Sequence, residues 1–311
     1  MRDKTYLISV LLGSGLLLYV GRGMLLESTV VTWGLTFAGT TAAGVMGMAL
    51  YRVQQELRAS RHELARKQAE LNFAYEVQQA LFPRQFPRDG GLEFSGVCVP
   101  ASGISGDYYD VLDLADGRLV FAIADISGKG ISAAILMSNL HAVLRTLAHS
   151  GHAPAEVCSR LNRHLFDVAD GTRFATMFYA EWNCRERRLH YINAGHNPPI
   201  FFSAGGVRRL EPGGTPLGMF YAVEYPVGEL VLQPGDLIAL YSDGVTEAGI
   251  DRDNDFGEAR LESTLTAHRD RSLVEIQRRV VEAVHDWAGQ ELEDDMTLLL
   301  VRATEVRKEE S

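Results

Sequence analysis

From residue 92 onward, short apolar runs of strand length alternate with paired amphipathic segments of helical length. Runs that alternate apolar and polar residues, or that are apolar throughout, are typical of half-buried and buried strands. They predict strands at Leu92–Pro100, Tyr108–Leu114, Leu119–Ile126, Phe174–Trp182, Leu189–Ala194, Pro199–Phe202, Val207–Leu210, Glu229–Leu232, Leu237–Ser242 and Met296–Arg302. Apolar residues at helical spacing predict helices at Gly130–Ser150, Pro154–Ala169, Gly257–His268 and Leu273–Gly289. Hairpin-linked strands with helices in pairs favour an α+β layered sandwich that forms one domain.

Two apolar stretches precede this region. Thr5–Gly21 and Ser28–Tyr51 contain no charged residue, and a membrane-spanning helix needs about 20 apolar residues. A signal peptide is the alternative for the first stretch alone, but the second stretch follows closely, which favours a two-helix transmembrane hairpin. Basic residues precede the first stretch and follow the second, so the positive-inside rule places both ends of the hairpin in the cytoplasm. We therefore expect a multi-pass protein of the inner (cytoplasmic) membrane with a cytoplasmic globular domain.

The segment between the apolar stretches and the strands has the composition of a long helix. No Gly or Pro occurs from Met48 to Phe82, and Leu57, Leu64 and Leu71 recur at heptad spacing. This spacing predicts a coiled-coil linker that continues the second membrane helix, and a homodimer formed through the linker and the membrane helices. A single helix packed on the globular domain is the alternative.

Prolines after the linker end the helical pattern. The chain is thereby divided into a transmembrane hairpin (1–51), a helical linker (52–84), a globular domain (85–304) and a charged tail (305–311). The net charge of −10 argues against nucleic acid as a partner. The three cysteines lack metal-ligand spacing and are expected to be reduced thiols.

Five short motifs occur in order along the predicted domain: SGDYYD (105–110), ADISGKG (124–130), AGHNPP (194–199), YSDGVTE (241–247) and DDMT (294–297). Within them, Asp107, Asp125, Asp243 and Asp294 each lie at the start or the end of a predicted strand. Carboxylates held at strand ends supply the fixed oxygen ligands that hard divalent cations need. Two such cations can activate a water and neutralise a phosphate. The pattern therefore indicates a metal-dependent hydrolase of phosphate esters.

Each of these aspartates also has a purely local explanation. Asp125 would cap the helix that follows it, and Asp243 would form a turn with the next glycine. Asp294 and Asp295 would lie in a solvated loop, and Asp107 on a solvated strand face. Four such coincidences in order are less plausible than one shared site.

The ordered set of motifs resembles the PPM-type metal-dependent serine/threonine protein phosphatases. It is most similar to their bacterial SpoIIE/RsbU-like branch, whose members dephosphorylate anti-sigma-factor antagonists and related phosphoproteins. The segment Ala74–Pro83 also resembles the helix that leads into the catalytic domain of that branch. The resemblance covers roughly residues 74–302 and implies a layered α-β-β-α sandwich.

The resemblance further implies two metal ions, Mn²⁺ or Mg²⁺, and a role for each matching residue. Asp125 would bridge the ions, and the backbone carbonyl of Ile126 would complete its side of the site. Asp243 and Asp294 would hold the first ion. Asp107 would support the second, directly or through water, so that these four aspartates are the candidate catalytic residues.

Other positions match the family less closely or have less certain roles. Asp110 and Asp295 are candidate outer-sphere partners of metal-bound waters. Lys129 stands where the family motif usually has His, and it is a candidate phosphate contact, because the phosphate-binding Arg of eukaryotic relatives has no counterpart here. His196 matches the family and is more typical of a structural turn than of a proton donor.

Together, these features predict a membrane-anchored protein phosphatase that hydrolyses phosphoserine or phosphothreonine on a cytoplasmic regulatory protein by a metal-activated water. Two alternatives remain. A membrane-attached nucleotide cyclase also places paired aspartates after a coiled-coil linker. A catalytically inactive pseudophosphatase would bind phosphoproteins without turnover.

Overall fold

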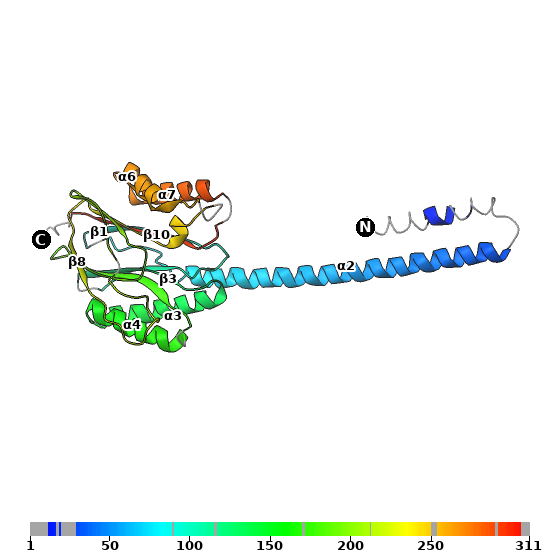
Figure 1. The fold of residues 1–311 in the computed structure, drawn as a ribbon, viewed down its shortest axis with the longest axis horizontal. Helices are drawn as coiled ribbons and strands as arrows, with labels where there is room; N and C mark the ends of the chain where they lie inside the picture. Colours follow the sequence, from blue (N-terminus) through cyan, green and yellow to red (C-terminus); the bar gives the residue numbers. More distant parts are fainter. Residues whose placement is uncertain are drawn as a thin grey trace. The chain divides into compact units, whose positions relative to one another are not determined.

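The computed structural model describes residues 12–16, 19, 29–88, 90–114, 117–169, 172–211, 213–249, 254–289 and 292–305. The chain forms two compact units, Met1–Glu70 and Leu71–Ser311. Most of the first predicted membrane stretch lies outside the described residues. The second stretch is helical from Thr29 and belongs to α2 (Thr29–Gln79), which continues without a break through the predicted linker (Figure 1).

Among the described residues, one helix is long and apolar enough to cross a membrane by length and composition alone, and it is α3 (Ile131–Ala148). This helix packs on a sheet of the second unit, where Met137, Leu140 and Leu144 are fully buried. The two N-terminal membrane helices expected from the sequence are therefore not among the helices that meet this criterion.

Ten strands of the second unit form two antiparallel sheets of five strands each. One has the order β1-β10-β9-β6-β7, and the other has the order β2-β3-β4-β5-β8. The strands are β1 (Leu92–Val99), β2 (Tyr108–Asp113), β3 (Arg118–Ile126), β4 (Ala175–Asn183), β5 (Arg188–Ala194), β6 (Ile200–Ser203), β7 (Gly206–Arg209), β8 (Gly228–Val231), β9 (Leu237–Tyr241) and β10 (Met296–Ala303).

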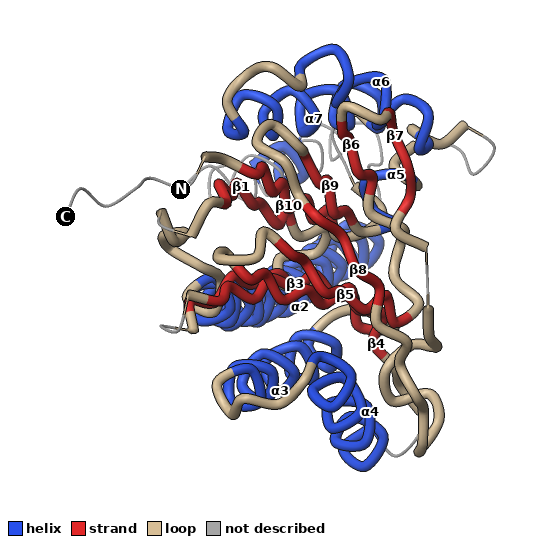
Figure 2. Tube along the Cα trace, turned by 90° about the vertical axis from the view of Figure 1, so that its left-hand side faces the viewer, coloured by secondary structure: helices blue, strands red, loops and turns tan. Residues whose placement is uncertain are grey.

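A pair of helices covers the outer face of each sheet, which gives the layer order α-β-β-α (Figures 1 and 2). Helices α3 and α4 (Pro154–Ala169) pack on β2–β5. Helices α6 (Gly257–His268) and α7 (Leu273–Ala288) pack on each other, and α7 packs on β1 and β10. The predicted sandwich and its strand positions are confirmed. The short helix α5 (Asp243–Thr246) was not predicted, since the sequence indicated only a turn there.

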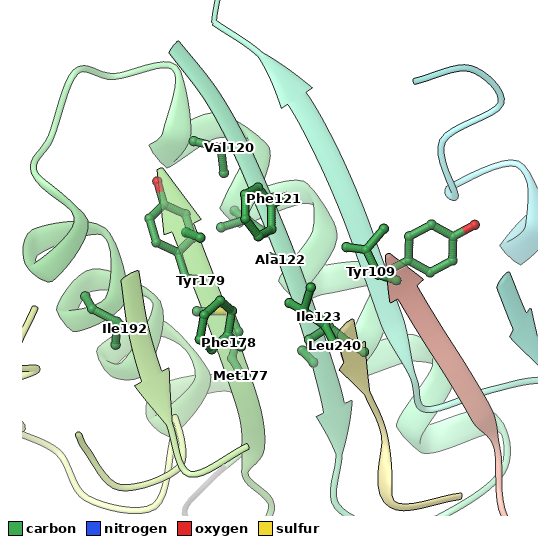
Figure 3. Close-up of a cluster of buried hydrophobic side chains, with 14 of the residues drawn as sticks. Tyr109, Val120, Phe121, Ala122, Ile123, Met177, Phe178, Tyr179, Ile192 and Leu240 are labelled. Atoms are coloured by element: carbon green, nitrogen blue, oxygen red, sulfur yellow. The ribbon is translucent and has the colours of Figure 1, made fainter. Parts of the chain in front are cut away.

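Alternation along the central strands explains why the sheets stack. Successive side chains of a strand point to opposite faces. In β9, Ile238 and Leu240 belong to the core between the sheets, whereas Leu237, Ala239 and Tyr241 belong to the core under α6 and α7. Figure 3 shows Leu240 among the buried side chains of the facing sheet. The two sheets therefore share one apolar layer, and their strand ends are held in fixed positions.

A glycine in β1 permits a close approach between the two sheets. A Cβ added to Gly96 would lie 2.5 Å from the ring of Tyr109 in β2. The same ring packs on Phe82, with ring centroids 5.1 Å apart. Any side chain at residue 96 would therefore displace a buried aromatic ring.

We expect Gly96→Ala to lower the stability of the domain by about 1–3 kcal/mol, because overpacking a filled core has that cost. Thermal unfolding followed by circular dichroism measures the change. Gly205→Ala is the matched control, since a Cβ there meets only the Ser203 hydroxyl at 3.6 Å. Equal unfolding temperatures for the two variants would contradict this packing argument.

Candidate functional site

The four aspartates singled out in the sequence come from the ends of neighbouring central strands. Asp107 directly precedes β2, and Asp125 is the penultimate residue of the adjacent β3. Asp243 follows β9 and opens α5, and Asp294 lies shortly before the adjacent β10. Each sheet therefore contributes two carboxylates.

The charges of these carboxylates act on one another, which shows that the structure brings them together. Burial raises the pKa of Asp125 to about 7, and the charges of Asp243, Asp294 and Asp295 add to this effect. Burial and the charge of Asp125 raise the pKa of Asp107 well above its ordinary value. Burial and the charge of Asp294 raise the pKa of Asp243.

Asp107 is the most deeply buried member of this group, with 1% of its surface exposed. Its N–H donates to the hydroxyl of Ser105 at 2.9 Å. Its Oδ2 atom is buried and has no hydrogen-bond partner in the described part of the chain. Burial, with the Asp107 charge as a further cause, raises the pKa of the neighbouring Cys98 thiol to about 12, so this cysteine is not a thiolate nucleophile.

Asp295 fixes the loop that carries Asp107. One carboxylate oxygen accepts a hydrogen bond from the Ala101 amide at 2.9 Å, and the other accepts from the Gly106 amide at 2.8 Å. Both oxygens are therefore engaged by backbone N–H groups. The sequence proposed Asp295 as an outer-sphere partner, whereas the structure gives it the role of joining the β10 end to the loop before β2.

Two glycines of the motifs leave room for the backbone segments around the site to pack closely. A Cβ on Gly244 would lie 2.1 Å from the carbonyl oxygen of Asp295, so a larger residue would separate the β9 and β10 ends. A Cβ on Gly106 would lie 3.2 Å from the carbonyl oxygen of Ile126 and 3.3 Å from the Cβ of Ala133. The Ile126 carbonyl, a predicted ligand, thus lies directly against the loop that carries Asp107.

Asp110 has different partners from those expected. Its carboxylate, which is 1% exposed, accepts two hydrogen bonds from Arg145 of α3 at 2.7 and 2.9 Å and one from the Tyr108 hydroxyl at 2.8 Å. Asp110 therefore ties β2 to α3. The outer-sphere role expected for it from the sequence stays a prediction.

His196 is a structural residue of the turn after β5. Its Nδ1 atom lies 2.8 Å from the hydroxyl of Thr176, and its amide donates to Asn193 at 2.8 Å. Burial lowers the pKa of His196 to about 4, so the ring is neutral at physiological pH. The structural interpretation from the sequence agrees with this environment.

Sequence reasoning missed the contact of Gln78 with the site. This residue near the end of α2 is 4% exposed. Its amide nitrogen donates to the Ser105 carbonyl at 2.7 Å, and its amide oxygen accepts from the Ser105 N–H at 2.8 Å. The single signal for this contact in the sequence is the position of Gln78 in the segment that resembles the helix before the catalytic domain of the family.

The donor chemistry fits hard divalent cations, which prefer carboxylate and carbonyl oxygens. The raised pKa values of Asp107 and Asp125, and the buried Oδ2 of Asp107 without a hydrogen-bond partner among the described residues, fit carboxylates that serve as cation ligands. No group of three or more His, Cys, Asp or Glu side chains in the described part of the chain is gathered tightly enough to hold an ion as it stands. At Asp294, the Oδ2 atom lies 2.8 Å from the Lys129 ammonium.

A polar cavity of about 380 Å³ opens beside Asp294. Lys129, Gly244, Glu247 and Glu293 are among the residues that line it. The site thus combines clustered carboxylates with an adjoining space where part of a substrate can bind.

Comparisons with known proteins show what the chain is similar to. The chain matches the family described as Stage II sporulation protein E (SpoIIE) over residues 115–304. It is 34% identical over 259 residues to the phosphoserine phosphatase RsbU of Bacillus subtilis, which is 82% of this chain and 75% of that protein.

Solved structures show the same fold. The SiaA-PP2C domain of Pseudomonas aeruginosa matches 77% of this chain and 98% of its own chain, with a TM-score of 0.68 and 21% identity. A structure of RsbX in complex with magnesium matches 71% of this chain and 99% of its own, with a TM-score of 0.55 and 18% identity.

The raised pKa of Asp125 predicts a stability that depends on pH. The folded, metal-free protein holds the Asp125 proton up to about pH 7, whereas the unfolded chain loses it near the ordinary Asp value of about 4. This carboxyl group therefore contributes stability at low pH that is lost as pH rises through about 7. In EDTA, we expect Asp125→Asn to be more stable than wild type at pH 8, and the difference to shrink steadily as pH falls toward the ordinary Asp value of about 4.

Thermal unfolding of both proteins across this pH range measures the difference. Buried histidines such as His196 are common to both proteins, so their contributions cancel. Asp113→Asn, at an exposed position of β2, is the control and should show no such gap. A difference in unfolding temperature between wild type and Asp125→Asn that stays constant with pH would contradict the clustering of charge at Asp125.

Proposed function

Because the chain belongs to the SpoIIE family of PPM-type protein phosphatases, we propose that it hydrolyses phosphoserine or phosphothreonine on a cytoplasmic regulatory protein. An anti-sigma-factor antagonist is the substrate class that the family suggests. One observation carries the proposal: carboxylates from the strand ends of both sheets lie close enough for their charges to raise one another's pKa values. The relative RsbU is a phosphoserine phosphatase, which supports the substrate chemistry.

We assign the following roles to the residues of the site. Asp107, Asp125, Asp243 and Asp294, with the Ile126 carbonyl, would hold two Mn²⁺ or Mg²⁺ ions. Such ions, when bound, supply an activated water and neutralise phosphate charge. Asp295 positions the Asp107 loop through two backbone amides. The magnesium in the RsbX structure supports the choice of cation.

We also propose that the protein is anchored in the cytoplasmic membrane and forms a dimer through α2. The uncharged stretch Ser28–Tyr51 supports the anchor. Large apolar side chains along this part of α2, including Val30, Trp33 and Phe37, are at least 75% exposed in the chain alone. Water is an unfavourable surrounding for so many apolar side chains, whereas lipid or a second helix is favourable. The heptad leucines support pairing along the linker.

We expect Asp125→Asn to lower phosphate release from a phosphoserine peptide by more than about 100-fold at saturating Mn²⁺. Loss of a partner one step removed from a metal costs 10–100-fold, and a direct ligand is worth more. Asp113→Asn is again the control and should retain wild-type activity. A rate of phosphate release by Asp125→Asn within a few-fold of the wild-type rate would contradict the assignment of Asp125.

The same preparation separates the alternative functions. A wild-type protein that releases no phosphate from any phosphopeptide with Mn²⁺ or Mg²⁺ would favour a pseudophosphatase. Formation of cyclic nucleotide from nucleoside triphosphates would favour a cyclase. Either result would overturn the proposed function.

The linker proposal predicts a periodic response to insertions. One to four alanines inserted after Leu64 turn the following helix by about 100° each, so we expect phosphatase activity in membranes to rise and fall with the number inserted. Substitution of the exposed residues Arg61 or Arg66 by alanine keeps the length and serves as the control. Identical activity for every insertion variant would show that the linker is a passive tether.

A further inference from the structure

Lys129 lies on the carboxylate that is proposed to hold the first metal ion. Its ammonium group is 2.8 Å from Oδ2 of Asp294 and donates to the carbonyl oxygen of Glu293 at 2.7 Å. It reaches these partners from the loop between β3 and α3, four residues after Asp125, which lies in β3. One side chain thus joins the loop of one sheet to the strand end of the other.

The positive charge acts on more than Asp294. Hydrogen bonding to Asp294, together with the charges of Asp295 and Asp243, raises the pKa of Lys129. In return, the Lys129 charge works against the rise in the pKa of Asp243. Lys129 therefore partly neutralises a cluster of carboxylates that would otherwise repel one another.

An ammonium group and a divalent cation cannot use the same carboxylate oxygen at once. The ammonium has three donors and no lone pair, so it cannot become a ligand itself. A cation that binds Asp294 through Oδ2 must displace it. The positive charge of the displaced lysine would remain close to the cation and repel it.

The surroundings make this displacement easy. The side chain of Lys129 is 60% exposed and that of Asp294 is 41% exposed, and exposed ion pairs are worth about 1 kcal/mol or less. The adjoining cavity is also lined by Glu247, Asp255 and Glu293, so acidic groups surround the space into which the ammonium would move.

We propose that Lys129 is the resident counter-ion of the metal site: it positions Asp294 when the cation is absent and weakens the site's affinity for the cation by competing for Asp294. The inference rests on the proposed metal site and adds to it a residue that sets metal affinity. A unit charge about 6 Å from a dication in water corresponds to roughly a tenfold change in affinity. Loss of the lysine charge should therefore tighten metal binding.

The test is the equilibrium binding of Mn²⁺ alone, without substrate, to the full-length chain purified in detergent. Titration calorimetry, or the loss of the free Mn²⁺ signal in electron paramagnetic resonance, gives the Kd. We expect Lys129→Ala and Lys129→Gln to lower the Kd about five- to tenfold, and Lys129→Arg to stay near wild type. Lys67→Ala, at an exposed lysine paired with Glu63 in α2, is the matched control and should leave the Kd unchanged.

Salt provides a readout that a purely structural role would not affect. The ratio of the wild-type Kd to the Lys129→Ala Kd should shrink between about 0.05 M and 0.5 M KCl, because exposed charges are screened. An unchanged or weaker affinity in both neutral variants, or a ratio that does not depend on salt, would overturn the proposal. Failure of the wild-type protein to bind Mn²⁺ at all would instead overturn the proposed metal site.

Discussion

Repulsion between like charges is the constraint on which the rest of the catalytic unit depends. Several carboxylates must stay close together, although burial and mutual repulsion both disfavour their charged forms. Flexible loops alone would let them move apart. In this fold, each of the four carboxylates lies at or near the end of a strand whose register is fixed by a filled apolar layer between the sheets. The core thus holds together charges that would separate if they were free.

A second set of contacts holds the strand ends in place. Asp295 binds the loop before β2 through two amides, and the buried Ser242 hydroxyl accepts from the Thr297 amide at 2.9 Å. Ser242 also donates to the Asp295 carbonyl at 3.2 Å. These residues need not touch a cation. They fix the backbone on both sides of the carboxylates, and the glycines at 106 and 244 leave room for the approach.

Much of this arrangement can be read from the sequence, because strands and helices follow local periodicity. The strand-end position of the four aspartates follows from the same pattern. By contrast, the contacts of Asp295 and Lys129 join segments that are far apart in the chain. No local pattern encodes such pairs, since they depend on how the two sheets are stacked. The short helix α5 escaped detection for a related reason: a four-residue helix has no periodicity to read.

The amide of Gln78 forms with Ser105 the two hydrogen bonds that a neighbouring β-strand would form. The last turn of the helix therefore pairs with the loop before β2 as one residue of a neighbouring strand would. The Ser105 N–H has a single acceptor there, and it is shielded from water only while the helix end is seated. The hydrogen–deuterium exchange rate of this amide therefore measures how often that helix end opens locally. One backbone proton would report how often the catalytic loop loses its support from α2.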